Sequence, residues 1–67
     1  MKLKKYHVDT SPLTPENQEK AMYFIEVNAY NHQFIPNTDG QYVCFWEENV
    51  KPSAFPALFG CVIEELP

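Results

Sequence analysis

The stretch Gln41–Glu47 constrains the fold most strongly, because it is dense in aromatic and β-branched side chains and follows a turn sequence at Asn37–Gly40. Successive residues of a strand point to opposite faces of the sheet. The two faces of this strand would be Tyr42/Cys44/Trp46 and Val43/Phe45/Glu47. One helix covers one face, so a strand that is apolar on both faces predicts a second cover, either residues 48–60 or another chain.

A helix is predicted from Thr14 onward. Thr14 is a good N-cap residue, Pro15 suits the first helical position, and Glu16 lies in the first turn, where the helix dipole favours an acid. Apolar residues then recur at a spacing of three and four, and they predict a helix that ends near Tyr30 or Asn31. The residues expected to form its buried stripe are Ala21, Met22, Phe24, Ile25 and Ala29.

Two further strands are predicted at Leu3–Asp9 and Cys61–Leu66. Residues 33–40 read as a loop, and residues 48–60 as an irregular segment, with a helical turn opening at Pro52 or Ser53 as the alternative. The order strand, helix, strand, strand predicts an α+β fold in which one helix packs on a small three-stranded mixed sheet.

The strand order is predicted from handedness and charge. A right-handed crossover through the helix would make the first two strands parallel. We expect the last strand to lie between them, because Glu64 and Glu65 would then lie near Lys4 and Lys5.

Composition limits the class of protein. With 67 residues, residues 1–67 form a single small domain, and a 45% hydrophobic content suits a core that needs no metal or disulfide. Nine acids oppose five lysines, there is no arginine, and the net charge of −4 disfavours nucleic acid as a partner. The chain starts at Met1 without a signal peptide or a long apolar run, so we expect a complete small cytoplasmic protein with no membrane contact.

Few residues suggest chemistry. His7, His32, Cys44 and Cys61 match a zinc site in number but lack the close pairs that zinc ligands form. Neither cysteine sits at a helix N-terminus or beside a basic residue, which would mark a reactive thiol. We therefore expect no catalytic residue, no metal site and no cofactor, and an enzymatic function is the less favoured hypothesis.

The surplus of aromatic residues favours a non-catalytic protein–protein interaction, regulatory or inhibitory protein. It would bind a protein partner, or a second copy of itself as a homodimer, through an aromatic sheet face or through residues 48–60. The residues predicted to bind the partner are Tyr42, Trp46, Phe55, Leu58 and Phe59. Two alternatives stay open: a small ligand-binding or enzymatic domain that acts as a dimer, and single-stranded nucleic-acid binding on sheet aromatics.

Overall fold

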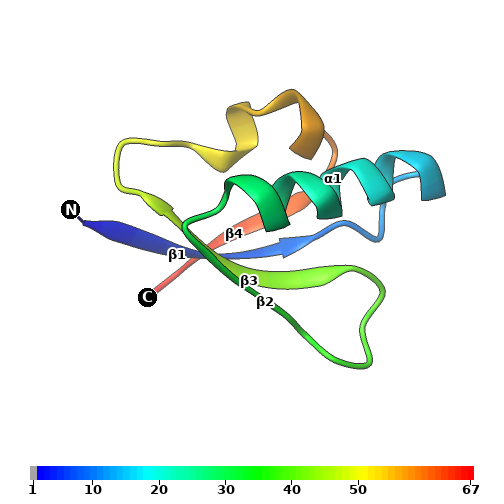
Figure 1. Ribbon diagram of the computed structural model, residues 1–67, viewed down its shortest axis with the longest axis horizontal. Coiled ribbons are helices and arrows are strands. Elements are labelled where there is room, and N and C mark those ends of the chain that lie inside the picture. The colour runs from blue at the N-terminus through cyan, green and yellow to red at the C-terminus, as the bar shows by residue number, and fades with distance from the viewer. Residues whose placement is uncertain (1) are drawn as a thin grey trace.

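A computed structural model describes residues 2–67. One helix packs on a four-stranded sheet of order β2-β3-β1-β4, in which every neighbouring pair is antiparallel (Figure 1). The elements are β1 (Leu3–Asp9), α1 (Pro15–Asn28), β2 (Asn31–Phe34), β3 (Gln41–Glu47), the 3₁₀ turns η1 (Pro52–Ala54) and η2 (Pro56–Leu58), and β4 (Val62–Leu66). The predicted α+β class is confirmed.

The local signals at the start of α1 act as predicted. Thr14 caps the helix, and its Oγ1 accepts a hydrogen bond from the Asn17 amide at 3.4 Å. The helix ends at Asn28, earlier than predicted, because the amide of Tyr30 already donates to the Phe45 carbonyl of the sheet. The stripe that the spacing predicted faces the core, with Ala21 and Ile25 fully buried.

The prediction of a three-stranded mixed sheet was wrong, because residues 31–34 form β2, which sequence reasoning had missed. A turn joins β2 to β3, and Asn37 and Gly40 in this turn have φ values of 64° and 75°. The crossover rule applies to a strand that directly follows the helix. Here the strand that directly follows the helix is β2. The turn after β2 reverses the direction of the chain, so β3 runs antiparallel to β1.

The predicted position of the last strand was also wrong. β4 lies at the edge of the sheet beside β1, and β1 lies between β3 and β4. The predicted charge match is nevertheless present, since Lys4 Nζ lies 3.5 Å from Glu65 Oε1. This contact requires only that β1 and β4 be neighbours, and it therefore did not determine which strand lies in the middle.

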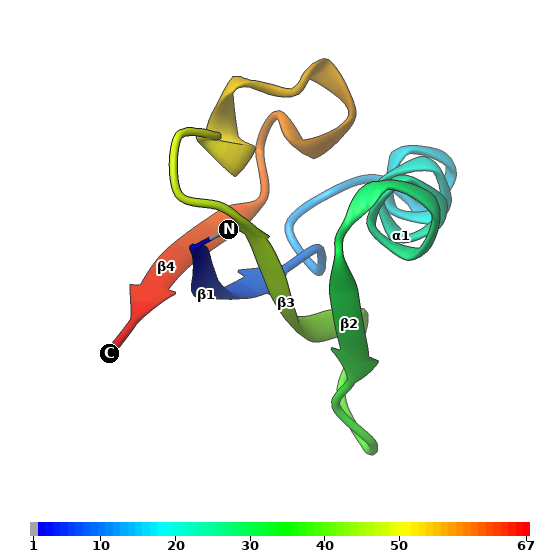
Figure 2. The same cartoon turned by 60° about the vertical axis from the view of Figure 1, so that its left-hand side comes forward.

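A single layer covers one face of the sheet. Figure 2 shows α1 and the 3₁₀ segment side by side on the same side of the strands. Phe55 joins the two halves of this layer to the sheet, because its ring centroid lies 4.9 Å from that of Phe24 and 6.1 Å from that of Trp46. Residues 48–60 thus share the helix-covered face and do not cover the second one. The buried core consists of Tyr6, Val8, Ala21, Ile25, Tyr42, Cys44, Trp46 and Leu58.

Within residues 2–67, no helix combines the length and the apolar character needed to cross a membrane.

Candidate interaction surface

The face of the sheet opposite α1 is the candidate site, and we call it the open face. Strand register decides which side chains share it, because directly paired residues point the same way. Phe45 pairs with Lys5, which pairs with Leu66, and Val43 pairs with His7. The apolar residues of the open face are Leu3, Val43, Phe45, Val62 and Leu66.

The open face has an apolar centre on β3 and apolar margins. Val43 and Phe45 are half-buried, and α1, η1 and η2 lie on the other side of the sheet. At the margins, Leu3 is 43% exposed and Val62 is 57% exposed. An antiparallel sheet with one solvated face usually presents polar side chains there. The open face departs from that pattern at the middle of a central strand.

Charges surround this apolar centre. The open face carries the carboxylates of Asp9, Glu47 and Glu64 and the single lysine Lys5. Hydrogen bonding from the Ser11 amide, which donates to Asp9 Oδ1 at 2.9 Å, lowers the pKa of Asp9. Asp9 is therefore firmly ionised at neutral pH, and the open face is acidic.

A histidine lies within this surface. The Nε2 atom of His7 and the Oε1 atom of Gln41 are 3.0 Å apart. His7 faces Glu64 across the β1–β4 pair. The contact with Gln41 fixes the orientation of the ring between the apolar centre and the acidic side of the face.

The structure distributes the five predicted partner-binding residues over three environments. Tyr42, Trp46 and Leu58 are core residues, with exposed fractions of 2%, 3% and 1%, so a partner cannot reach them. Phe55 is half-buried, whereas Phe59 is 82% exposed. The five residues therefore do not form one surface.

The residues that do form the open face were visible in the sequence as the second face of residues 41–47. The two faces were similarly apolar, and the larger aromatic residues drew the prediction to Tyr42 and Trp46. Those larger side chains fill the core because they bury more apolar area under α1 and the 3₁₀ segment. Val43 and Phe45 are left outside.

Neither thiol has the lowered pKa that marks a reactive cysteine. Cys44 and Cys61 are free, and burial raises the pKa of Cys44 to about 12 and also raises the pKa of Cys61. A nucleophilic cysteine needs a lowered pKa. Nowhere in residues 2–67 do three His, Cys, Asp or Glu side chains gather as a metal site would require.

Comparisons of the chain with family models, with curated proteins and with solved structures gave no significant match.

Proposed function

We propose that this protein is a non-catalytic interaction protein that binds a protein partner through the open face. One observation carries the proposal: the centre of that face, Val43 and Phe45, is apolar and lies outside the layer formed by α1, η1 and η2. Burying apolar surface contributes about 25 cal/mol per Å². A contiguous apolar patch rimmed by polar residues is typical of a protein-binding site.

The charge of the open face specifies the partner. Three carboxylates and one lysine surround the apolar centre, so a partner with lysine or arginine around an apolar patch is complementary to it. A second copy fits less well, because two molecules of net charge −4 would bring acidic faces together. By covering a basic surface of its partner, the protein would act as a regulator or inhibitor. A reducing compartment such as the cytoplasm suits its two free thiols.

The other hypotheses gain less support. Stacking of single-stranded nucleic acid needs aromatic rings among cations. The rings of Tyr6, Tyr42 and Trp46 are buried, which leaves Phe45 as the aromatic residue of the open face, beside Lys5 and three acids. A catalytic cysteine is not supported, because burial raises the pKa of both thiols.

The test is photocrosslinking from the open face, followed by binding measurements with the purified partner. A photoreactive phenylalanine analogue at position 45 would capture the partner from native cells, and the same analogue at position 59 is the matched control. The isolated partner should then bind the native protein, and Phe45→Ser should weaken binding at least about tenfold, as expected for a central interface residue. Phe59→Ser should leave the affinity unchanged, and raising the salt concentration should weaken it.

Three results would overturn the proposal. The first is a captured partner whose affinity is insensitive to Phe45→Ser. The second is affinity that does not fall with salt, because the partner would then not be recognised by charge. The third is a free protein that sediments as a dimer at neutral pH and crosslinks to itself through position 45, because a second copy would then be the occupant.

A further inference from the structure

The strand β2 offers a free edge on the opposite side of the sheet from β4. It pairs with β3 alone among the described strands, and its residues Asn31–Phe34 are all exposed. Alternate residues of an antiparallel strand direct their amide and carbonyl groups to the same neighbour. The Ile35 amide donates to the Gln41 carbonyl at 2.9 Å, so His32 and Phe34 direct theirs outward. An added strand would find these groups ready to pair.

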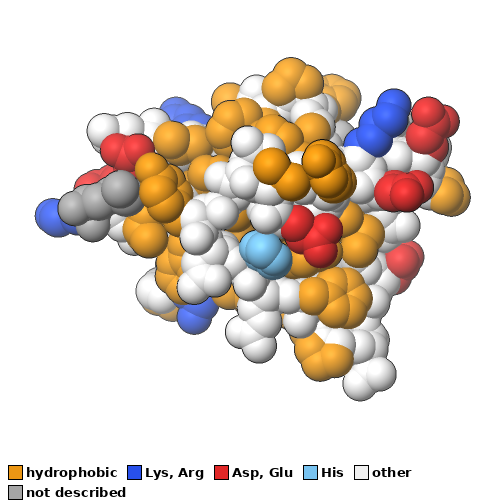
Figure 3. Space-filling view, viewed as in Figure 1, with side chains coloured by type: hydrophobic (Ala, Val, Ile, Leu, Met, Phe, Trp, Pro, Cys, Tyr) orange, Lys and Arg blue, Asp and Glu red, His pale blue; other side chains and the backbone are white. Residues whose placement is uncertain are grey.

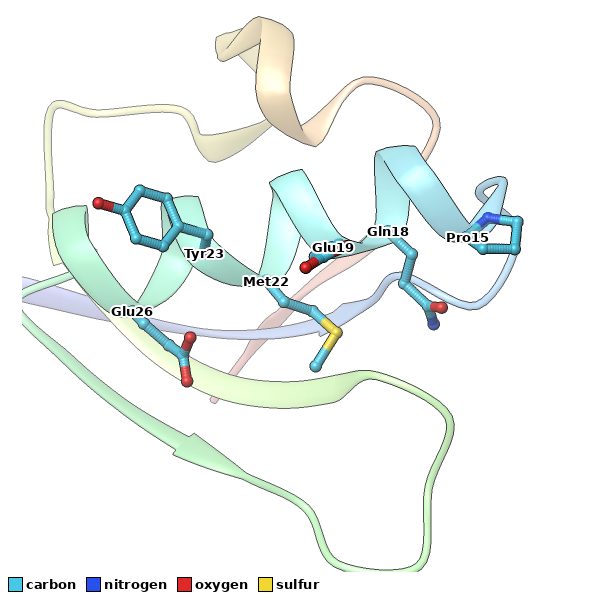
Figure 4. Close-up of a pocket in the computed structure, with 6 residues that line it drawn as sticks. All are labelled: Pro15, Gln18, Glu19, Met22, Tyr23 and Glu26. Atoms are coloured by element: carbon cyan, nitrogen blue, oxygen red, sulfur yellow. The ribbon is translucent and has the colours of Figure 1, made fainter.

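A hollow lies on the flank of α1 that faces the β2–β3 hairpin. Its volume is about 320 Å³, and Figure 4 shows Met22 and Gln18 pointing from the helix toward the hairpin, with Glu26 further along the same flank. The lining residues are Pro15, Gln18, Glu19, Met22, Tyr23 and Glu26. Apolar and carboxylate groups alternate along this flank, and no lysine lines it.

The hollow and the β2 edge belong to one surface. α1 contacts β2 directly, and Gln18, which lines the hollow, donates from Nε2 to the Asp39 carbonyl in the turn between β2 and β3 at 3.2 Å. Burial of the Tyr42 ring raises its pKa, and the negative charge of Glu26 on α1 raises it further. The same ring packs against β2, with centroid distances of 5.4 Å to Phe34 and 6.2 Å to His32. In Figure 2, β2 is the edge strand of the sheet that lies below α1. Tyr42 thus links the helix flank to the edge strand below it.

The chemistry of this surface favours an extended peptide segment with basic side chains as its ligand. Figure 3 shows acidic side chains around the helix, with hydrophobic side chains between them and a basic side chain beside the acids at one end. A lysine or arginine side chain has an apolar stem and a charged head. The stem would pack on the Met22 thioether and the Tyr23 ring, and the head would lie among the carboxylates of Glu19 and Glu26.

We propose that β2 and the adjacent flank of α1 form a second binding site, which takes an extended basic peptide segment as a fifth strand and one of its lysine or arginine side chains in the hollow. This site lies along the β2 edge and on the helix side of the sheet, whereas the open face is the opposite side, so binding here does not require the apolar centre Val43 and Phe45. A protein with both sites would hold two partner segments at once, one on the open face and one along the β2 edge.

A second copy of this chain is the less favoured occupant. In the antiparallel pairing of two β2 strands that aligns Tyr30 with Phe34, His32 would face its own copy. That arrangement would also bring the Glu26 residues of two acidic molecules toward each other.

The test is an NMR titration of the ¹⁵N-labelled protein with a short capped peptide of threonine, valine and lysine. The matched peptide carries glutamate in place of each lysine, and a third peptide keeps the lysines but has N-methylated alternate amides that cannot pair with a strand edge. The lysine peptide should shift the amide signals of residues 31–34 and of the α1 flank, and the other two should not. Glu26→Gln should weaken its binding by roughly twofold to fivefold.

Glu64→Gln is the control variant, because it removes the same charge from the open face and should leave binding of the lysine peptide unchanged. If the N-methylated peptide bound as tightly as the lysine peptide, the proposal that the peptide adds a strand to β2 would be overturned. If the glutamate peptide bound as tightly as the lysine peptide, or if Glu26→Gln had no effect, the proposal that the hollow binds a basic side chain would be overturned. Shifts confined to the open face, or pairing of two β2 strands in the free protein, would overturn the site itself.

Discussion

At the scale of single residues, Trp46 shows which face of β3 contributes more to the free energy of unfolding. It is 3% exposed, and its ring centroid lies 6.5 Å from that of Tyr6 and 6.1 Å from that of Phe55. We expect Trp46→Ala to lower the free energy of unfolding by roughly 3–5 kcal/mol, because it leaves a cavity where the helix-covered layer meets the sheet. Urea unfolding would measure the loss. Phe45→Ala, one residue away on the open face, should cost only about 1 kcal/mol, and equal losses would contradict the assignment of faces.

The burial of Cys44 can be tested through the pH dependence of the free energy of unfolding. Burial raises its pKa from 9.0 to about 12 in the folded protein. The unfolded chain therefore loses the thiol proton first, and the stability that burial of the neutral thiol confers is intact below pH 9 and declines as the pH rises toward 12. Urea unfolding between pH 7 and pH 10.5 should show a steeper decline for the native protein than for Cys44→Ala. Parallel pH profiles of the two proteins would show that the thiol titrates normally.

At the scale of elements, the β2–β3 hairpin is held to the rest of the fold at Gly40. The Thr10 amide and hydroxyl both donate to the Gly40 carbonyl, at 3.0 and 2.7 Å. A methyl group on Gly40 would collide with the buried Thr10 hydroxyl and lie 2.6 Å from Gln18 Nε2, at a φ of +75°. We expect Gly40→Ala to cost at least about 2 kcal/mol.

Gly60→Ala is the matched control for this substitution. Gly60 also has positive φ, at +90°, but a methyl group there would meet only the mobile end of Leu13, at 2.9 Å from Cδ2. Its cost should be about 1 kcal/mol, and thermal unfolding of the two variants would give the difference. Equal destabilisation would mean that backbone strain alone, rather than the contact with Thr10, explains both.

The same hairpin shows how far sequence reasoning reached. β1, β3 and the start of α1 were predictable because alternation and capping are local signals. The sequence of β2, Asn31 to Phe34, contains few β-forming residues, and it forms a strand because the turn before β3 folds it back onto that strand. Missing this one short strand changed the predicted direction of β3 and the strand count.

The candidate site was predictable in part, for a related reason. Alternation placed Val43 and Phe45 together on one face of β3, and the excess of apolar residues on both faces indicated that one needed a partner. Which face meets the helix depends on how side-chain volumes fill the layer, and this is a property of the whole fold. The hollow beside α1 could not be predicted, because it depends on how the helix side chains that line it are oriented in the folded protein.

At the scale of the whole molecule, charge opposes self-association through the open face. The net charge is −4 at pH 7, and the isoelectric point is about 4.9. Near that pH the repulsion between molecules vanishes while the apolar centre of the face is unchanged, so we expect the protein to sediment as a monomer at pH 7 and to associate near pH 4.9. Phe45→Ser should suppress this association, since it removes the largest apolar side chain of the open face. Phe59→Ser should not, although Phe59 is 82% exposed, because Phe59 is a single exposed ring, whereas Phe45 shares the open face with Val43 and Leu3. If Phe59→Ser abolished association and Phe45→Ser did not, the molecule would self-associate through the 3₁₀ segment rather than through the sheet.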